Sequence, residues 1–156
     1  MSEDSMTASA MEPNAAVAGA SEIEIAAPPE RVWKVLAAID RWPSWNPDVK
    51  SMSITGQVRP GSVFRWKAGT STITSTIRLF EPPRLISWTG KTFGMRANHL
   101  YCLEAGDGRT IVRTEESFYG VFARLLRRTL QKTLDDALES SLRHLKAEVE
   151  RPDAGS

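Results

Sequence analysis

The sequence predicts an α+β fold in which a curved antiparallel sheet of six to seven strands wraps around a long C-terminal helix. Residues 49–118 contain short segments of alternating polar and apolar residues separated by turns, which is typical of a strand meander. Residues 119–151 contain no proline and place leucines three or four apart, which predicts one amphipathic helix on the order of 45 Å long. A helix of that length can cover the apolar face of a whole sheet.

The first expected elements are a strand and two small helices. Ser21-Glu22-Ile23-Glu24-Ile25 alternates with the period of a half-buried strand. Pro28-Pro29-Glu30-Arg31 then starts a helix that runs to about Ile39, because proline fits the first turn and an acidic residue suits the positive helix end. Trp42-Pro43-Ser44-Trp45-Asn46-Pro47 follows, and its two prolines limit it to a helical turn or tight corner.

Turn sequences divide the meander into six further strands. Arg59-Pro60-Gly61, Glu81-Pro82-Pro83-Arg84 and Gly106-Asp107-Gly108 are rich in the residues that turns require. Because the connections are short, neighbouring strands are expected to pair antiparallel. The predicted strands cover about residues 49–56, 62–69, 71–81, 84–90, 94–104 and 109–118.

A single folded domain is expected, because 156 residues supply one hydrophobic core of ordinary size. Residues 1–20 are rich in Ser, Ala, Glu and Met without a strand or helix period, which predicts a disordered tail. Residues 152–156 give the same prediction. The ligand-binding domain is therefore predicted to span residues 21–151.

Composition narrows the class of protein. Hydrophobic residues make up 41% and charged residues 25%, as in soluble globular proteins, and a net charge of +1 argues against a nucleic-acid partner. The single cysteine, Cys102, and the two histidines provide no internal disulfide and no cluster with metal-ligand spacing. We therefore expect no metal, no cofactor and a cytoplasmic location. Apolar runs are far shorter than the roughly 20 residues that cross a bilayer, so no transmembrane segment is expected.

Strand alternation predicts which side chains face the long helix. If the hairpin at Gly106-Asp107-Gly108 pairs Leu103 with Thr110, then Ala97 lies opposite Glu116, and His99 is a diagonal neighbour of Glu116. The expected inward set mixes large apolar and small polar residues: Phe64, Trp66, Ile73, Ser75, Ile77, Leu79, Ile86, Trp88, Ala97, His99, Tyr101, Leu103, Thr110, Val112, Thr114 and Glu116.

These inward polar groups predict a cavity. On the helix, steps of about 100° place Ala137 and Ser141 near the middle of the leucine stripe, with Thr133 beside them. An unpaired buried polar group costs about 1–3 kcal/mol in a dry core, whereas a cavity that holds ligand or water tolerates it. The predicted ligand-binding residues are Phe64, Trp66, Ser75, Ile77, Trp88, Ala97, His99, Tyr101, Val112, Thr114, Glu116, Leu130, Thr133, Leu134, Ala137 and Ser141.

Several segments of residues 21–150 share a pattern with a known superfamily. They include Ala27-Pro28-Pro29-Glu30-Arg31-Val32-Trp33, the Trp42 to Pro47 corner, Gly61 with Phe64-Arg65-Trp66, Pro82-Pro83-Arg84-Leu85-Ile86-Ser87-Trp88, and Thr110 to Glu116 before the long helix. With these segments the chain resembles the START-like, helix-grip (SRPBCC) superfamily of polyketide cyclases and aromatases, pollen-allergen-type ligand binders and lipid-transfer domains. The resemblance implies a helix-grip fold whose large cavity binds or transforms hydrophobic molecules, but it carries over no catalytic set.

Three functions remain open from the sequence. The first is binding, with possible transport, of a hydrophobic small molecule such as a lipid or polyketide. The second is a cyclase or aromatase in which His99, Glu116 or Tyr101 moves protons in the same cavity. The third is a module that binds protein partners while its cavity is vestigial. Since polar residues in a cavity wall are more often structural, we assign no catalytic residue and keep these three as candidates.

The tryptophans and the basic helix start also have two readings each. Trp33, Trp42 and Trp45 are expected to pin the small helices to the sheet, whereas Trp66 and Trp88 lie on inner faces where they could touch a ligand. The final helix begins with basic residues that could attract an anionic membrane, but nearby acidic residues partly cancel that charge, so membrane docking is not expected. The two groups are Arg124, Arg127, Arg128 and Lys132, and Asp135, Asp136 and Glu139.

Overall fold

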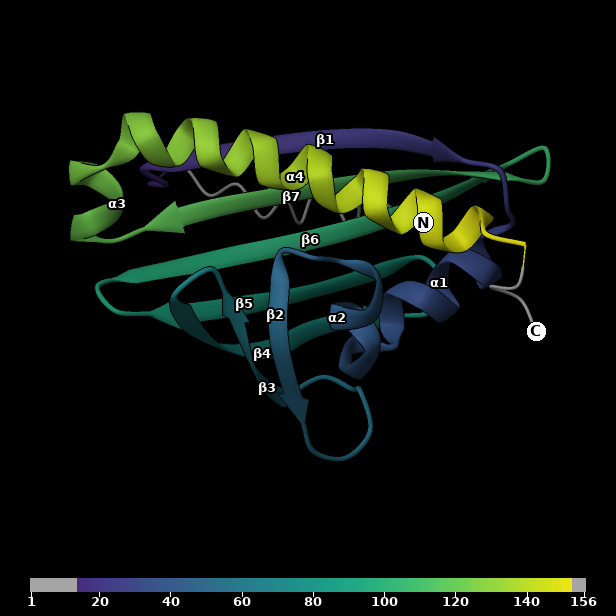
Figure 1. Ribbon diagram of the computed structural model, residues 1–156, viewed down its shortest axis with the longest axis horizontal. Helices are drawn as coiled ribbons and strands as arrows, with labels where there is room; N and C mark the ends of the chain where they lie inside the picture. The colour runs from purple at the N-terminus through teal and green to yellow at the C-terminus, as the bar shows by residue number, and fades with distance from the viewer. Residues whose placement is uncertain (1–13, 153–156) are drawn as a thin grey trace.

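The computed structural model describes residues 14–152, and over this range the chain forms one seven-stranded sheet and a long C-terminal helix (Figure 1). The order of strands is β1-β7-β6-β5-β4-β3-β2, and every neighbouring pair is antiparallel. The elements are β1 (Val17–Ile25), α1 (Pro29–Ala37), a 3-10 turn η2 (Ile39–Arg41), α2 (Trp42–Trp45), β2 (Val49–Ile54), β3 (Val63–Ala68), β4 (Ser71–Glu81), β5 (Leu85–Thr92), β6 (Met95–Gly106), β7 (Arg109–Tyr119), α3 (Val121–Leu125) and α4 (Arg127–Glu150).

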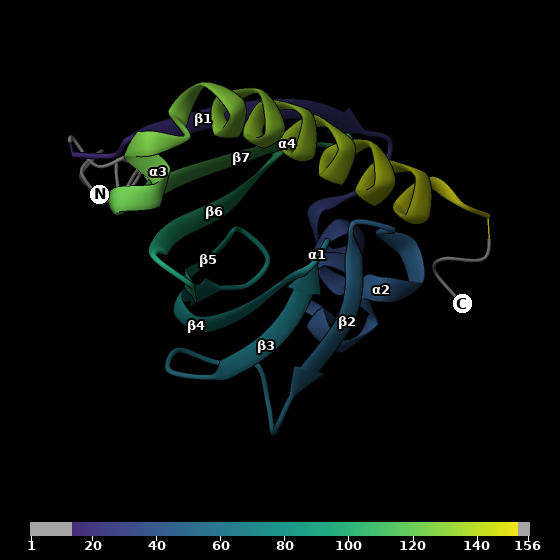
Figure 2. The same ribbon diagram turned by 60° about the vertical axis from the view of Figure 1, so that its left-hand side comes forward.

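The sheet curls around α4, as the second view shows (Figure 2). The helix lies along β1 and β7. Helices α1 and α2 lie near the C-terminal half of α4. Since β1 and β2 are the two edges of the sheet and do not pair, the sheet stays open. The predicted α+β class, strand number and long covering helix are confirmed.

Strand β1 starts at Val17, four residues before the alternating segment that predicted it. Its first half, Val17-Ala18-Gly19-Ala20, is made of small residues and carries no strand signal of its own. These residues pair with Phe118 to Glu115 on β7, and they let α4 approach closely. A Cβ on Gly19 would lie 3.2 Å from Leu138 Cδ1. Of the tails predicted over residues 1–20 and 152–156, residues 1–13 and 153–156 lie outside the described residues, whereas residues 17–20 belong to β1 and not to a tail.

The C-terminal helix is divided in two, in contrast to the single helix predicted over residues 119–151. The break is at Leu126, whose φ of −108° and ψ of 21° depart from helical values. Before α3, Gly120 takes a φ of 112°, a conformation that glycine adopts without strain, and it ends β7. No proline marks the break, so the leucine spacing alone could not reveal it.

The turn between β6 and β7 lies one residue further along the chain than the predicted pairing requires. Asp107 and Gly108 both have positive φ, 51° and 76°, which is the two-residue type I′ geometry favoured by the Asp-Gly dipeptide. Gly106 therefore pairs with Arg109, and the register differs by two residues from the predicted one. A shift of two keeps every side chain on its face but places His99 directly opposite Glu116.

A β-bulge between Ile77 and Leu79 corrects one predicted inward residue. Beyond the bulge the alternation reverses, so Leu79 packs with Leu85 and Leu100 in a separate cluster. Phe80 takes the inward place instead, with its ring 5.4 Å from that of Trp33 on α1. The bulge thus supplies the aromatic side chain on which α1 docks.

The main core fills only one end of the space under α4. There, residues of α1 and the sheet pack against the last buried residues of α4, which are Leu142, Leu145 and Val149. The earlier part of α4 places Leu134 and Leu138 against Val17 of β1 instead. The sheet beyond β7 consequently has no dry core opposite the first half of the helix.

Gly19→Val is expected to destabilise the fold, because a Cβ there would lie 3.2 Å from Leu138 Cδ1 and 3.4 Å from Leu134 Cδ2, and both leucines are buried. Overpacking of this kind typically costs about 1–3 kcal/mol. Gly106→Val is the matched control, since a Cβ at that position meets nothing within 4 Å. Denaturant unfolding followed by circular dichroism measures both, and equal stability of the two variants would contradict the close approach of α4 to β1.

Candidate functional site

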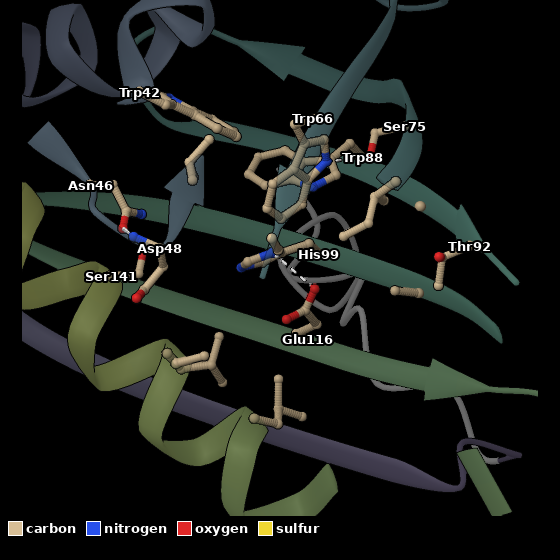
Figure 3. Close-up of a pocket in the computed structure, with 18 of the residues that line it drawn as sticks. Trp42, Asn46, Asp48, Trp66, Ser75, Trp88, Thr92, His99, Glu116 and Ser141 are labelled. Carbon is tan, nitrogen blue, oxygen red and sulfur yellow. Dashed lines mark hydrogen bonds and ion pairs between the residues drawn. The ribbon is translucent and has the colours of Figure 1, made fainter. Parts of the chain in front are cut away.

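A cavity of about 240 Å³ lies between the sheet and the first half of α4 (Figure 3). Small residues make the room for it: Gly90 and Ala97 face each other on β5 and β6, and Ala137 lies on α4. Thr133 and Ala137 line the cavity and are also exposed to solvent. The cavity therefore opens to the surface beside α4.

Most of the predicted ligand-binding residues line this cavity. They come from β3 to β7 and from one side of α4, as the alternation and the helical spacing indicated. The residues are Trp66, Ser75, Trp88, Ala97, His99, Tyr101, Glu116, Thr133, Leu134, Ala137 and Ser141.

The structure places the other five predicted residues outside the cavity lining. Phe64, Ile77 and Val112 lie in the main core. Leu130 packs at the β1 side of α4 with Val17 and Phe118, as part of another cluster. Thr114 is fully buried, and its hydroxyl supports His99 from behind.

Sequence reasoning did not place the α2 corner in the cavity wall. Trp42, Trp45, Asn46 and Asp48 all line it. Trp42 does pin the corner, because its indole Nε1 donates a 2.9 Å hydrogen bond to the carbonyl of Leu36. It also reaches the sheet, where its ring is 5.2 Å from Trp88, 5.8 Å from Phe64 and 6.5 Å from Trp66. In the sequence, this corner is marked by two tryptophans beside two prolines, and that pattern fits residues that fix the corner to the sheet as well as residues that line a cavity.

His99 and Glu116 form the polar centre of the cavity and point toward each other (Figure 3). His99 Nδ1 lies 3.2 Å from Glu116 Oε2, close enough for an ion pair but too poorly aligned for a hydrogen bond. The side chains are only 11% and 15% exposed, so solvent screens the pair weakly. They face each other because β6 and β7 pair in this register.

Thr114 fixes the hydrogen on the other ring nitrogen of His99. The Thr114 hydroxyl donates a 3.0 Å hydrogen bond to the Leu100 carbonyl, so its oxygen can only accept from His99 Nε2, 2.8 Å away. Nδ1 and the Glu116 carboxylate would then be two acceptors facing each other unless a proton lies on one of them. The pair can thus hold a transferable proton inside a mainly apolar cavity.

Tyr101 is the second polar group and is held by α4. Its hydroxyl lies 2.6 Å from the Ser141 hydroxyl, a hydrogen bond that links β6 to the helix. Burial raises the pKa of Tyr101 to about 12, against the smaller lowering effect of that hydrogen bond. At neutral pH the phenol is therefore protonated and can donate to an acceptor.

Aromatic rings surround these polar groups. The ring centroid of His99 is 4.7 Å from that of Trp88 and 5.0 Å from that of Tyr101. Trp66 covers the next part of the wall and donates from Nε1 to Ser75 Oγ at 3.1 Å. Flat apolar faces with a few polar groups at one place are typical of a small-molecule site.

Over residues 14–152, no three His, Cys, Asp or Glu side chains come together as a possible metal site. In the same range, no helix combines the length and the apolar character that a membrane span requires.

The family model described as polyketide cyclase / dehydrase and lipid transport matches residues 17–150, which is nearly the whole described range. The chain belongs to this polyketide cyclase/dehydrase and lipid transport family. The match begins at Val17, where β1 begins, and ends at Glu150, where α4 ends. The predicted START-like resemblance is thereby confirmed. No curated protein matches the sequence significantly.

Solved structures of other proteins share the fold of this family member. A hypothetical protein from Helicobacter pylori aligns with a TM-score of 0.80 at 16% identity, over 90% of this chain and 92% of its own. A START superfamily protein from Mycobacterium smegmatis aligns at 0.74 and 16% identity, over 85% and 97%. The Zhui aromatase/cyclase from Streptomyces sp. R1128 aligns at 0.71 and 18% identity, over 87% and 97%. Identities this low show a common fold alone.

Tyr101 is expected to ionise near pH 12 in the folded protein, above its ordinary pKa of 10.0. Its pKa is raised from 10.0 to about 12, so the folded state binds the phenolic proton more tightly than the unfolded chain does. This contribution to stability is complete below pH 10 and declines as pH rises from 10 toward 12. In Tyr119→Phe protein, where Tyr101 is the one tyrosine left of two, ultraviolet absorbance of the phenolate measures the titration. A midpoint near 10 in protein that is still folded would contradict the buried, hydrogen-bonded placement.

Proposed function

We propose that the chain binds an apolar small molecule, such as a lipid or polyketide, in the cavity between the sheet and α4. The observation that carries the proposal is the lining, in which Trp42, Trp66 and Trp88 form an aromatic wall and His99, Tyr101 and Glu116 are polar groups in the same cavity. Membership of a family described by polyketide cyclisation and lipid transport supports the same class of ligand. The unpaired Cys102 is compatible with the cytoplasmic location that we propose for this function.

The cavity geometry suggests how such a ligand lies. A volume of about 240 Å³ is slightly below the roughly 300–1,000 Å³ usual for small-molecule sites, so the ligand is compact or extends through the opening beside α4. Its apolar body would pack on the tryptophan faces. Its polar end would meet the protonated Tyr101 hydroxyl and the His99–Glu116 pair, which lie on adjacent strands.

Ala137→Phe is expected to block the cavity, because Ala137 lines it at the opening. Binding of the uncharged fluorophore N-phenylnaphthylamine should weaken at least about tenfold, or 1.4 kcal/mol. Ala147→Phe is the matched control, an exposed alanine on the same helix that does not line the cavity.

Equal affinities of the two variants for the fluorophore, or no binding of it by the natural protein, would contradict the proposal. Native mass spectrometry of protein purified from its own host complements the fluorophore test. A copurifying lipid or polyketide would identify the chemical class of the ligand.

A second candidate function is acid–base catalysis on the same ligand, as in a cyclase. The observation that favours it is the His99–Glu116 pair, which faces the cavity and can hold a transferable proton. Tyr101 could polarise a ligand carbonyl beside it. This candidate uses the same pocket and differs from binding alone only in turnover.

Glu116→Gln separates the two functions, because it keeps the shape of the side chain and removes its charge. For a catalyst, cyclisation of a flexible polyketide substrate should slow by about 10²–10⁴, as for loss of a general acid–base group. Glu104→Gln, an exposed position on β6, is the control. Unchanged product formation in Glu116→Gln and His99→Ala, measured by chromatography, would show that the pair has no catalytic role.

A further inference from the structure

An apolar surface lies at the end of the molecule where the cavity opens. Among residues 14–152, six large hydrophobic side chains are exposed, and all but Val63 belong to this one surface. We call it the α3 surface. Its members and their exposed fractions are Phe93 88%, Val121 69%, Phe122 41%, Leu125 72% and Leu126 52%.

The α3 surface joins two segments that are distant in sequence. Phe93 belongs to the β5–β6 turn, and its ring centroid lies 5.7 Å from that of Phe122 on α3. Gly94 lies directly beneath Phe122, since a Cβ on Gly94 would overlap the Phe122 ring. The turn and α3 lie together at one end of the sheet in both ribbon views (Figures 1 and 2).

Packing holds this arrangement in place. Ala123 is fully buried and anchors α3, so its other side chains are directed outward. A Cβ on Gly120 would lie 2.7 Å from the Gly94 carbonyl oxygen, which shows how closely the chain entering α3 meets the β5–β6 turn. The exposed apolar side chains are therefore held in place by packing of α3 and the β5–β6 turn, and they do not belong to a loosely packed segment.

Cationic side chains surround the α3 surface. Segments 82–103 and 117–134, which contain the β5–β6 turn and α3, include no aspartate or glutamate. Their exposed cations are Lys91, Arg96, Arg124, Arg127, Arg128 and Lys132, of which Lys132 pairs with Asp136 at 3.2 Å. Without these six, the chain has more acidic than basic side chains, so its nearly balanced total of 20 against 19 conceals a strong asymmetry. A positive potential is concentrated at this end.

The cavity opens beside the same surface. Thr92, Met95 and Arg96 line the cavity, and they immediately flank Phe93 and Gly94 in the β5–β6 hairpin. On the helix side, Thr133 lines the cavity one residue after Lys132. Whatever covers the α3 surface would thus face the route into the cavity.

We propose that the α3 surface docks on an anionic phospholipid bilayer. Protruding apolar side chains flanked by cations match the interface of such a bilayer, where acyl chains lie below a layer of phosphates. Docking would also allow a ligand to pass between the bilayer and the cavity; that passage rests on the proposed binding function, whereas docking itself does not. Asp135, Asp136 and Glu139, whose charge argued against docking in the sequence, follow Lys132 on α4, where Asp136 pairs with Lys132 and offsets that one cation.

The test is cosedimentation with vesicles of phosphatidylcholine and phosphatidylglycerol in equal parts, compared with vesicles of phosphatidylcholine alone. The natural protein should bind the anionic vesicles and lose most binding at high salt, because the charge contribution is screened. Phe93→Ser combined with Leu125→Ser should weaken binding at least about tenfold, as apolar insertion is lost. Val63→Ser, an exposed apolar position elsewhere, should have no effect.

Charge reversal tests the second component. Arg124→Glu combined with Arg128→Glu should also weaken binding at least about tenfold. Lys50→Glu combined with Arg59→Glu changes charge equally at exposed positions outside the two segments and should preserve more binding. Circular dichroism and N-phenylnaphthylamine binding without vesicles show that each variant retains its fold and cavity.

Several outcomes would overturn the proposal. These are no sedimentation with anionic vesicles, equal binding to uncharged vesicles, or indifference to the Phe93 and Leu125 changes. A dimer that is lost in Phe93→Ser protein would assign the surface to a second copy of the chain. Preference for polyglutamate over vesicles would assign it to an acidic protein. N-phenylnaphthylamine binding in solution reports separately on the cavity, so a failure of docking is distinguishable from a failure of the proposed function.

Discussion

The contact between α4 and the first half of β1 is the constraint on which the rest of the structure depends. Gly19 allows the helix to lie close to the edge strand, and Leu134 and Leu138 seal that side. Farther along, Leu142 and its neighbours fix the helix against α1 and the sheet. Because the helix is held at one edge and at one end, the curled sheet diverges from it elsewhere. The cavity is the space left by that divergence.

Much of the fold follows from patterns within single segments. Period-two alternation located the strands from β2 to β7 within a few residues, and the leucine spacing located α4. The same patterns selected eleven of the residues that line the cavity. What they could not supply were the places where the pattern is interrupted by packing between segments. The bulge at Ile77 and Leu79 brings Phe80 against Trp33 of α1. The small residues at the start of β1 lie where α4 approaches, and the break at Leu126 follows α3, which packs on Phe93.

For His99 and Glu116, too, the sequence pattern predicts one part of the arrangement and the pairing of distant segments determines the other. That His99 and Glu116 would face inward followed from alternation, but their separation depends on register, and register depends on the turn. The role of Thr114 was hidden for a related reason. It is predicted to line the cavity, yet it lies behind His99 and hydrogen-bonds to the Leu100 carbonyl, so it orients the ring without touching the open space. Only the three-dimensional arrangement separates a wall residue from its support.

The Asp107-Gly108 turn has a consequence for how such a site could arise or disappear. If the turn lay at Gly106-Asp107 instead, the pairing of β6 with β7 would shift by two residues, and every strand residue would stay on its own side of the sheet, since the side-chain period is two. Glu116 would then lie opposite Ala97, and His99 opposite Thr114, with the core unchanged in composition. The polar pair thus depends on the position of the turn in a solvent-exposed loop at the far end of the hairpin. Moving the turn by one residue, without changing any inward residue, would separate His99 from Glu116.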